Sequence, residues 1–208
     1  MKKLLLAAGT VLLSSFAAGQ LLAGELPLAN PSFEEDCSTE TKIGNWLLVV
    51  GPGGIAWSRW DRATGGVVAS AGSALLFTNS PGAVVVQLIK EVPIQPGKYV
   101  FSADAASPAG GAGVESVSSR GLQMAIYAVP TTIEKEPRHT IIADKSISAE
   151  ELSQDEEWKT LEVAFEISPS SPFIGQFFQI NLTSTWPAPN APEPAQIDID
   201  NIRAQKLE

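Results

Sequence analysis

Residues 160–167 read Thr-Leu-Glu-Val-Ala-Phe-Glu-Ile, and this stretch decides the fold class. Every second side chain is large and apolar, while the side chains between them are small, polar or charged. Successive side chains of a β-strand point to opposite faces. The period of two therefore predicts a strand with one face on a core and the other toward solvent. Residues 122–128 and 178–183 alternate in the same way.

Apolar or alternating runs of strand length recur along the rest of the chain. The 17 Gly and 15 Pro residues separate them, for example in the Gly-Pro-Gly-Gly of residues 51–54. Short strands at this spacing predict an all-β fold, a sandwich of two antiparallel sheets in one domain. The capping-box pattern of residues 148–151 predicts one helical turn. The expected strands are residues 46–50, 55–60, 67–71, 74–78, 83–92, 99–106, 121–129, 140–147, 160–167, 173–185 and 196–204.

The charge balance argues against two classes of partner. Lys and Arg number 14 against 23 Asp and Glu, so the formal net charge is -9. Binding to nucleic acid or to an anionic membrane surface needs clustered basic side chains. Hydrophobic residues make up 44% of the chain, which is enough to fill a core and excludes global disorder.

The first 24 residues have the pattern of a targeting segment. Lys2 and Lys3 precede an uncharged apolar run, and small residues follow it. This pattern predicts a cleaved signal peptide over residues 1–24, a domain over residues 25–208, and a secreted or periplasmic location. A membrane anchor is the alternative, although polar residues weaken the run as a span.

Signs of enzyme chemistry are scarce in the sequence. His139 is the only His, and Cys37 is the only Cys, which is either a small buried hydrophobe or an intermolecular link. The usual zinc sites and a Gly-x-Ser-x-Gly elbow are missing. We therefore expect that the chain is not an enzyme. A small glycan hydrolase with two facing carboxylates is the less favoured alternative.

Several stretches, in order and spacing, resemble the jelly-roll carbohydrate-binding modules of bacterial polysaccharidases, a galactose-binding-like family. The resemblance spans nearly all of residues 25–208, and it implies a jelly-roll sandwich whose first and last strands are neighbours. It is carried by residues 28–34 (Leu-Ala-Asn-Pro-Ser-Phe-Glu), 44–46 (Gly-Asn-Trp), 96–103 (Pro-Gly-Lys-Tyr-Val-Phe-Ser-Ala), 158–161 (Trp-Lys-Thr-Leu) and 197–203 (Ile-Asp-Ile-Asp-Asn-Ile-Arg).

The resemblance also implies a structural calcium ion between the two ends of the domain. Glu34 matches the carboxylate of the family's Phe-Glu motif, and Asp200 matches the first Asp of its closing motif. Asn201 stands in place of the second Asp, and Glu35 and Asp198 are spare acids nearby. Backbone carbonyls of the loops would complete the six to eight oxygens that calcium prefers.

A poly- or oligosaccharide is the ligand that the resemblance implies. Sugar recognition needs aromatic rings against pyranose faces and amides or carboxylates for the hydroxyl groups. We therefore expect an exported carbohydrate-binding protein, with a structural or adhesive surface protein as the alternative. The candidate binding residues are Trp57, Trp60, Asp104, Gln123, Tyr127, Gln179, Asn181 and Trp186.

The calcium expectation can be tested by removing the metal. Purified domain should contain calcium by elemental analysis, and EDTA should lower its melting temperature because two carboxylates then lose their shared cation. Glu34→Gln should lower the melting temperature in calcium buffer and reduce the effect of EDTA. Protein without calcium, and with an unchanged melting temperature in EDTA, would show that the expectation is wrong.

Overall fold

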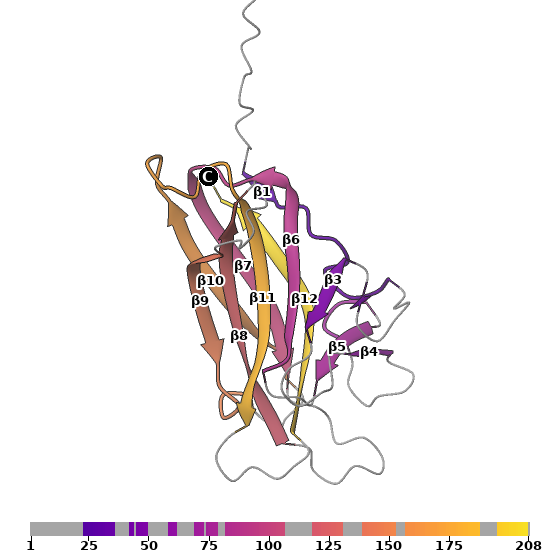
Figure 1. The fold of residues 1–208 in the computed structure, drawn as a ribbon. Coiled ribbons are helices and arrows are strands. Elements are labelled where there is room, and N and C mark those ends of the chain that lie inside the picture. Colours follow the sequence, from indigo (N-terminus) through magenta and orange to yellow (C-terminus); the bar gives the residue numbers. More distant parts are fainter. Residues whose placement is uncertain are drawn as a thin grey trace, which may run out of the picture.

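The final strand of the chain lies in the middle of one β-sheet. In the computed structural model, β12 (Ala195–Lys206) pairs with β7 (Gly97–Ala106) on one side and with β5 (Ala74–Thr78) on the other. β10 (Lys159–Ile167) extends the sheet beyond β7, and β4 (Ser58–Asp61) extends it beyond β5. We name this antiparallel sheet, in the order β10-β7-β12-β5-β4, sheet A (Figure 1).

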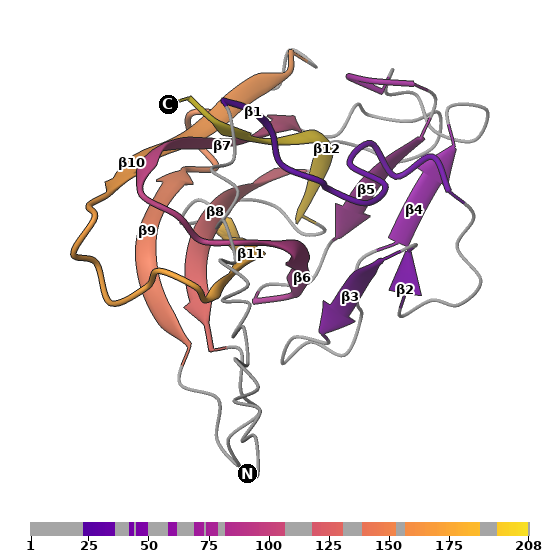
Figure 2. The same ribbon diagram turned by 90° about the horizontal axis from the view of Figure 1, so that it is seen from above.

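A second antiparallel sheet, sheet B, packs against sheet A. Its order is β9 (Thr140–Ile147), β8 (Ser118–Val129), β11 (Phe177–Pro187), β6 (Val84–Pro93), β3 (Trp46–Val49) and β2 (Lys42–Ile43). A short parallel pairing of β12 with β8 joins the two sheets at one end. The view from above shows the two layers on opposite sides of the interior (Figure 2). The predicted all-β sandwich is confirmed.

The structure describes residues 23–35, 42–43, 45–49, 58–61, 69–72, 74–78, 82–106, 118–130, 139–152, 157–187 and 195–207. The predicted signal peptide and Cys37 lie outside these ranges, so both predictions stay predictions. No helix within the described ranges is long and apolar enough to cross a membrane.

The core fills the space between the sheets with the apolar members of the alternating runs. Along β10, Leu161, Val163 and Ile167 are buried and Phe165 is partly buried, while Glu162, Ala164 and Glu166 are exposed. The rings of Tyr99, Phe101, Phe165 and Phe178 form one cluster across the two sheets. Burial of this apolar surface is the main favourable contribution to folding.

The two ends of the domain meet beside β12, as the resemblance implied. β1 (Gly24–Glu25) pairs with the last two residues of that strand, with Gly24 opposite Lys206. Next to it, the indole Nε1 of buried Trp46 donates to the backbone carbonyl of Asn30 at 3.1 Å. These contacts fix the first segment of the domain to both sheets.

Three of the expected local elements differ from the structure. Residues 173–176 form turns, so β11 begins at Phe177, after the Ser-Pro-Phe-Ile-Gly stretch ends. The expected strand at residues 67–71 is wrong over its described part, because residues 69–71 are irregular. Residues 148–151 form a hydrogen-bonded turn and not a helix, but the capping-box pair is present. Ser148 N donates to Glu151 Oε2 at 2.7 Å, and Glu151 N donates to Ser148 Oγ at 3.2 Å.

Candidate functional site

The outer face of sheet A, which points away from sheet B, carries three acidic side chains in its central strands. Ile197, Ile199, Ile202 and Ala204 of β12 belong to the core, as do Phe101, Ala103 and Ala105 of β7. Because side chains alternate along a strand, Asp198 and Asp200 of β12 and Asp104 of β7 lie on the opposite face. Asp200 is paired directly with Asp104, and Asp198 is paired with Ala106.

A β-bulge in β12 sets the position of these acids. The register with β7 shifts between Asp200 and Arg203, where two β12 residues oppose a single residue of β7. Asn201, at the bulge, has a positive φ of 50 degrees. Asn tolerates this left-handed conformation better than most residues. The bulge keeps Ile202 in the core and returns Arg203 to the acidic face.

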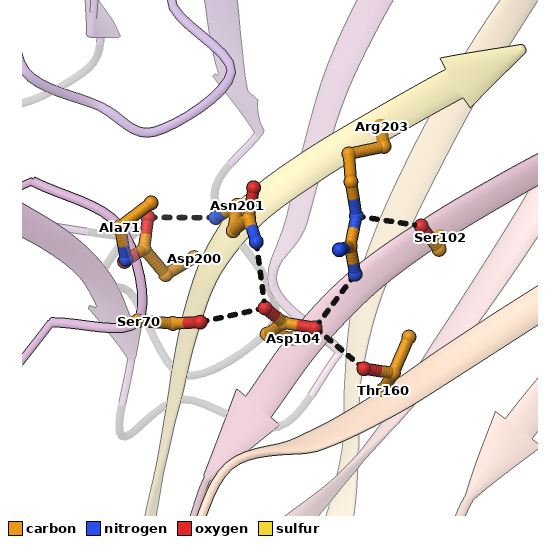
Figure 3. A network of polar contacts seen from close by, with 8 residues as sticks. All are labelled: Ser70, Ala71, Ser102, Asp104, Thr160, Asp200, Asn201 and Arg203. Atoms are coloured by element: carbon orange, nitrogen blue, oxygen red, sulfur yellow. Dashed lines mark hydrogen bonds and ion pairs between the residues drawn. The ribbon is translucent and has the colours of Figure 1, made fainter.

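Asp104 is held by four side-chain donors from three different segments (Figure 3). Its Oδ2 accepts from Ser70 Oγ at 2.6 Å and from Asn201 Nδ2 at 2.9 Å. Its Oδ1 accepts from Thr160 Oγ1 at 2.7 Å and from Arg203 Nη2 at 2.9 Å. This carboxylate therefore links β7, β10, β12 and the segment at residues 69–72.

The environment of Asp104 favours its ionised form. Burial raises its pKa, but the hydrogen bonds from Ser70, Thr160 and Asn201 and the charge of Arg203 together outweigh burial. The pKa of Asp104 therefore lies below its ordinary value. Arg203 also donates from Nε to Ser102 Oγ at 3.0 Å, which fixes the guanidinium across the strand pair.

Asp198 has the opposite environment. Its side chain is fully buried, with 0% of its surface exposed. Oδ1 accepts from Gln196 Nε2 at 2.7 Å, whereas Oδ2 has no hydrogen-bond partner among the described residues. Burial raises the pKa of Asp198 to about 7, and the Gln196 hydrogen bond opposes that shift only in part.

Asp200 lies between these two acids and anchors the segment at residues 69–72. Its Oδ2 accepts from the backbone N–H of Ala71 at 2.7 Å, and its Oδ1 accepts from that of Asn201 at 2.6 Å. Burial, with a smaller contribution from the charge of Glu34, raises the pKa of Asp200 to about 7, although backbone N–H donors oppose the shift. Glu34 is thus close enough for charge repulsion with Asp200.

The expected calcium ligands, Glu34 and Asp200, do lie beside one segment. Glu34 Oε1 accepts from Ala74 N at 2.8 Å, and its carboxylate occupies the space where a Cβ on Gly72 would stand. Two mutually repelling carboxylates suit a cation that would neutralise them. Among the described residues no group of three or more His, Cys, Asp or Glu side chains could hold a metal ion. The residues fit calcium only with added backbone oxygens, and its presence stays a prediction.

The expected carbohydrate-binding residues are divided between the two faces of the sandwich. Gln123, Tyr127, Gln179 and Asn181 share the outer face of sheet B, where Tyr127 is opposite Gln179. Asp104 lies on the outer face of sheet A, and its four donors occupy it. Trp57 lies outside the described residues, and so do the side chains of Trp60 in β4 and Trp186 in β11.

Sequence reasoning missed the acid that the structure singles out. Asp198 was expected only as a spare carboxylate, and Gln196 was not considered. The alternation Ile-Asp-Ile-Asp in residues 197–200 puts both acids on one face. Nothing in that pattern shows that this face is buried at Asp198.

Comparison with solved structures confirms the jelly-roll sandwich. The Stig cyclase Fisc from Fischerella sp. TAU, in complex with (3Z)-3-(1-methyl-2-pyrrolidinylidene)-3H-indole, is 19% identical with a TM-score of 0.67, covering 90% of this chain and 100% of that one. A cyclase from Fischerella sp. TAU, in complex with 4-(1H-indol-3-yl)butan-2-one, is 18% identical with a TM-score of 0.67, covering 89% and 100%.

The xylan-binding domain CBM22-1 of Xyn10C from Paenibacillus barcinonensis is 15% identical with a TM-score of 0.50, covering 86% of this chain and 92% of that one. At these identities the similarities establish a shared fold and nothing finer. The resemblance to carbohydrate-binding modules is therefore correct for the architecture.

The family is decided by a different comparison. No curated protein matches the chain, but the protein-family model described as HpiC1 cyclase matches residues 24–205. This match overturns the expectation that the chain is not an enzyme. That expectation failed because the missing His, Cys and Ser motifs exclude only the chemistries that need them. The chain belongs to the HpiC1-like cyclase family.

Proposed function

We propose that this protein is a cyclase that closes a ring in a small unsaturated molecule, with Asp198 as the proton donor. The family match supports the reaction class. The observation that carries the role of Asp198 is geometric: a fully buried carboxyl group with one oxygen that has no hydrogen-bond partner in the described part of the chain. A buried carboxyl without a cationic neighbour favours its neutral form, which is the form of a general acid.

The two best-defined acids of the face have environments that separate their roles. Four donors, one of them cationic, keep Asp104 ionised, and its oxygens are occupied. Asp198 has a single neutral donor and a pKa raised by burial to about 7, so it holds a proton near neutral pH. Environments that push acid pKa values apart distinguish a proton donor from a structural carboxylate.

The chemistry that follows from this arrangement is an isomerisation. Asp198 Oδ2 would give its proton to a π bond of the substrate, and the bond's electron pair would form the new C–H bond. A second π bond of the same molecule would attack the resulting cation and close the ring. Loss of a proton to the Asp198 carboxylate would restore the enzyme, so substrate and product would have the same composition.

Burial of Asp198 bears on how a substrate would reach it. The Asp198 side chain has no exposed surface, so substrate binding must uncover Oδ2. A site that admits the substrate and excludes water would also protect a cationic intermediate from hydration. An indole compound is a reasonable probe, because the similar Stig cyclase Fisc has been solved in complex with one.

The raised pKa of Asp198 predicts how stability depends on pH. The folded state binds the proton more tightly than the unfolded state, whose Asp has a pKa near 3.8. The free energy of unfolding should therefore fall as pH rises from about 4 to about 7, with a contribution from Asp198 on the order of 4 kcal/mol. Asp198→Asn should flatten this slope in denaturant titrations made without calcium.

Asp200 provides the internal control for that experiment. Its pKa is also raised to about 7, so Asp198→Asn should keep part of the slope, and further replacement of Asp200 should remove most of the rest. Asp144→Asn, at an exposed site on sheet B, should leave the slope unchanged. A full slope in Asp198→Asn would contradict a protonated Asp198.

Solvent deuterium would test the proton-donor role directly. The protein should convert members of a panel of indoles with unsaturated side chains into isomers of equal mass, detected by liquid chromatography and mass spectrometry. In D₂O the product should carry one deuterium where the π bond was protonated. Asp198→Asn should reduce the rate at least about a hundredfold, because general acid catalysis contributes on that order.

Asp144→Asn is the matched control for turnover, because it removes an acid from the opposite sheet. It should cyclise at the wild-type rate. Equal rates for wild type and Asp198→Asn would contradict the role of Asp198. An indole ligand would be contradicted if the protein converts none of the compounds and does not bind 4-(1H-indol-3-yl)butan-2-one in a fluorescence titration.

A carbohydrate ligand on sheet B is a second candidate function. The observation in its favour is that four predicted binding residues converge there on one outer face. Gln179 Nε2 donates to Asn181 Oδ1 at 2.9 Å, and Gln123 Nε2 donates to Asp144 Oδ2 at 3.0 Å. A half-buried Tyr127 lies in the same face, and its ring contacts that of His139. Amides beside a ring suit sugar hydroxyls and a pyranose face.

Affinity electrophoresis against soluble polysaccharides would test this face. A polymer that binds should retard the wild-type protein, and Tyr127→Ala should abolish the retardation without changing the melting temperature. Glu162→Ala, an exposed position on sheet A, is the control and should be retarded like wild type. If no polymer retards the wild-type protein, carbohydrate binding is contradicted and the cyclase proposal is unaffected.

A further inference from the structure

A hollow lies on the outer face of sheet B, where β3 ends beside β6. Its volume is about 560 Å³, which is in the range of small-molecule sites. β3 pairs with β6 only as far as Val86, and beyond that residue the segment at residues 27–29 lines the hollow together with β6. We call this space the β6 hollow, and its main lining side chains are Leu28, Leu47, Val86, Leu88, Lys90 and Glu91.

A buried glutamine fixes one wall of the β6 hollow. Gln87 is 3% exposed, and its side-chain amide pairs with the backbone of Ala29 as a neighbouring strand would. Its Oε1 accepts from Ala29 N at 3.1 Å, and its Nε2 donates to the Ala29 carbonyl oxygen at 2.8 Å. Residues 27–29 are therefore held beside β6 by a buried side chain. The hollow is preformed, which lowers the cost of ordering a site around a ligand.

The floor of the β6 hollow is aliphatic. Val85 and Ile89 belong to the core, so the alternation along β6 places Val86 and Leu88 on the outer face. Leu47 is opposite Val86. It is 58% exposed, the largest value for a large hydrophobic side chain among the described residues. Adjacent exposed aliphatic groups in a hollow of this size favour a ligand with an apolar part.

A β-bulge brings two opposite charges to the β6 hollow. The register of β6 with β11 shifts here, and residues 90–92 are left out of the pairing. Bulges re-aim side chains in this way. Lys90 and Glu91 are exposed and both line the hollow. Within the described ranges neither side chain forms a hydrogen bond or an ion pair with another residue. Both charges are therefore available to a ligand.

We propose that the β6 hollow binds a small amphipathic zwitterion, of which an apolar α-amino acid is the simplest case. The apolar part of the ligand lies on Leu47, Val86 and Leu88. Its carboxylate meets Lys90, and its ammonium group meets Glu91. A ligand with both charges complements both side chains, whereas a ligand with one charge leaves one of them unmatched. The hollow and Asp198 belong to opposite sheets, so this ligand is independent of the proposed cyclisation.

Three compounds with the same phenyl ring test the charge requirement. L-phenylalanine has both charges, phenylpropionate has only the carboxylate, and phenylethylamine has only the ammonium group. In amide-resolved NMR titrations, L-phenylalanine should shift the signals of residues 27–29 and 86–91 saturably. It should bind about twofold to fivefold more tightly than either other compound, which is the contribution of one exposed charge pair. No saturable shift with L-phenylalanine would overturn the proposal.

Charge variants should change the affinities in opposite ways. Lys90→Met keeps the aliphatic stem, and it should weaken L-phenylalanine and phenylpropionate about twofold to fivefold while leaving phenylethylamine unchanged. Glu91→Gln should weaken L-phenylalanine and phenylethylamine and leave phenylpropionate unchanged. Lys145→Met is the matched control, at an exposed lysine on the edge strand β9 of the same sheet, and it should bind all three like wild type. Wild-type affinity for L-phenylalanine in both charge variants would contradict recognition by Lys90 and Glu91.

Truncation of the exposed leucine tests the apolar floor. Leu47→Ala should weaken all three compounds by about fivefold, because each loses apolar contact of similar size. The side chain is largely exposed, so the melting temperature should stay close to the wild-type value. Ile141→Ala is the matched control, because Ile141 is 52% exposed on the same sheet but outside the hollow. Unchanged affinities in Leu47→Ala would place the ligand elsewhere and overturn the proposal.

Discussion

The alternation of apolar and acidic side chains along β12 is the constraint on which the rest of the structure depends. Ile197 and Ile199 contribute to the core, so the pleat of the strand directs Asp198 and Asp200 to the outer face. The strand is central in its sheet and cannot turn over without exposing its apolar face. Packing of the interior therefore holds two acids in a place where water does not stabilise their charges.

The three acids on this face differ in the hydrogen-bond donors that reach them. Asp104 and Asp200 accept hydrogen bonds from segments that are distant in sequence, and so they tie the face together. Asp198 has one neutral donor, and burial raises its pKa to about 7. One sheet face thus combines carboxylates in different environments, and the number and charge of the donors that reach each group differ between Asp104 and Asp198.

The sequence was a good guide to what depends on local pattern. A period of two is visible in a few residues, so β10 and β12 could be located and the sandwich foreseen. The site depends on which strands become neighbours, and pairings such as Asp104 with Asp200 join residues about a hundred positions apart. Residues 69–71 look like a strand, but carboxylates of β7 and β12 bind them in place of a neighbouring strand. The raised pKa of Asp198 is a property of burial, for which the sequence has no motif.

Gly72 shows how such a face restricts the sequence that builds it. Its φ of 69 degrees is one that residues with a side chain rarely adopt, and the carboxylate of Glu34 fills the space beside its Cα. Even alanine would have to displace Glu34 from the backbone N–H of Ala74. The identity of residue 72 is therefore coupled to an acid near the start of the domain. Among related sequences, loss of this glycine should be accompanied by a change at the position of Glu34, so the two positions should vary together.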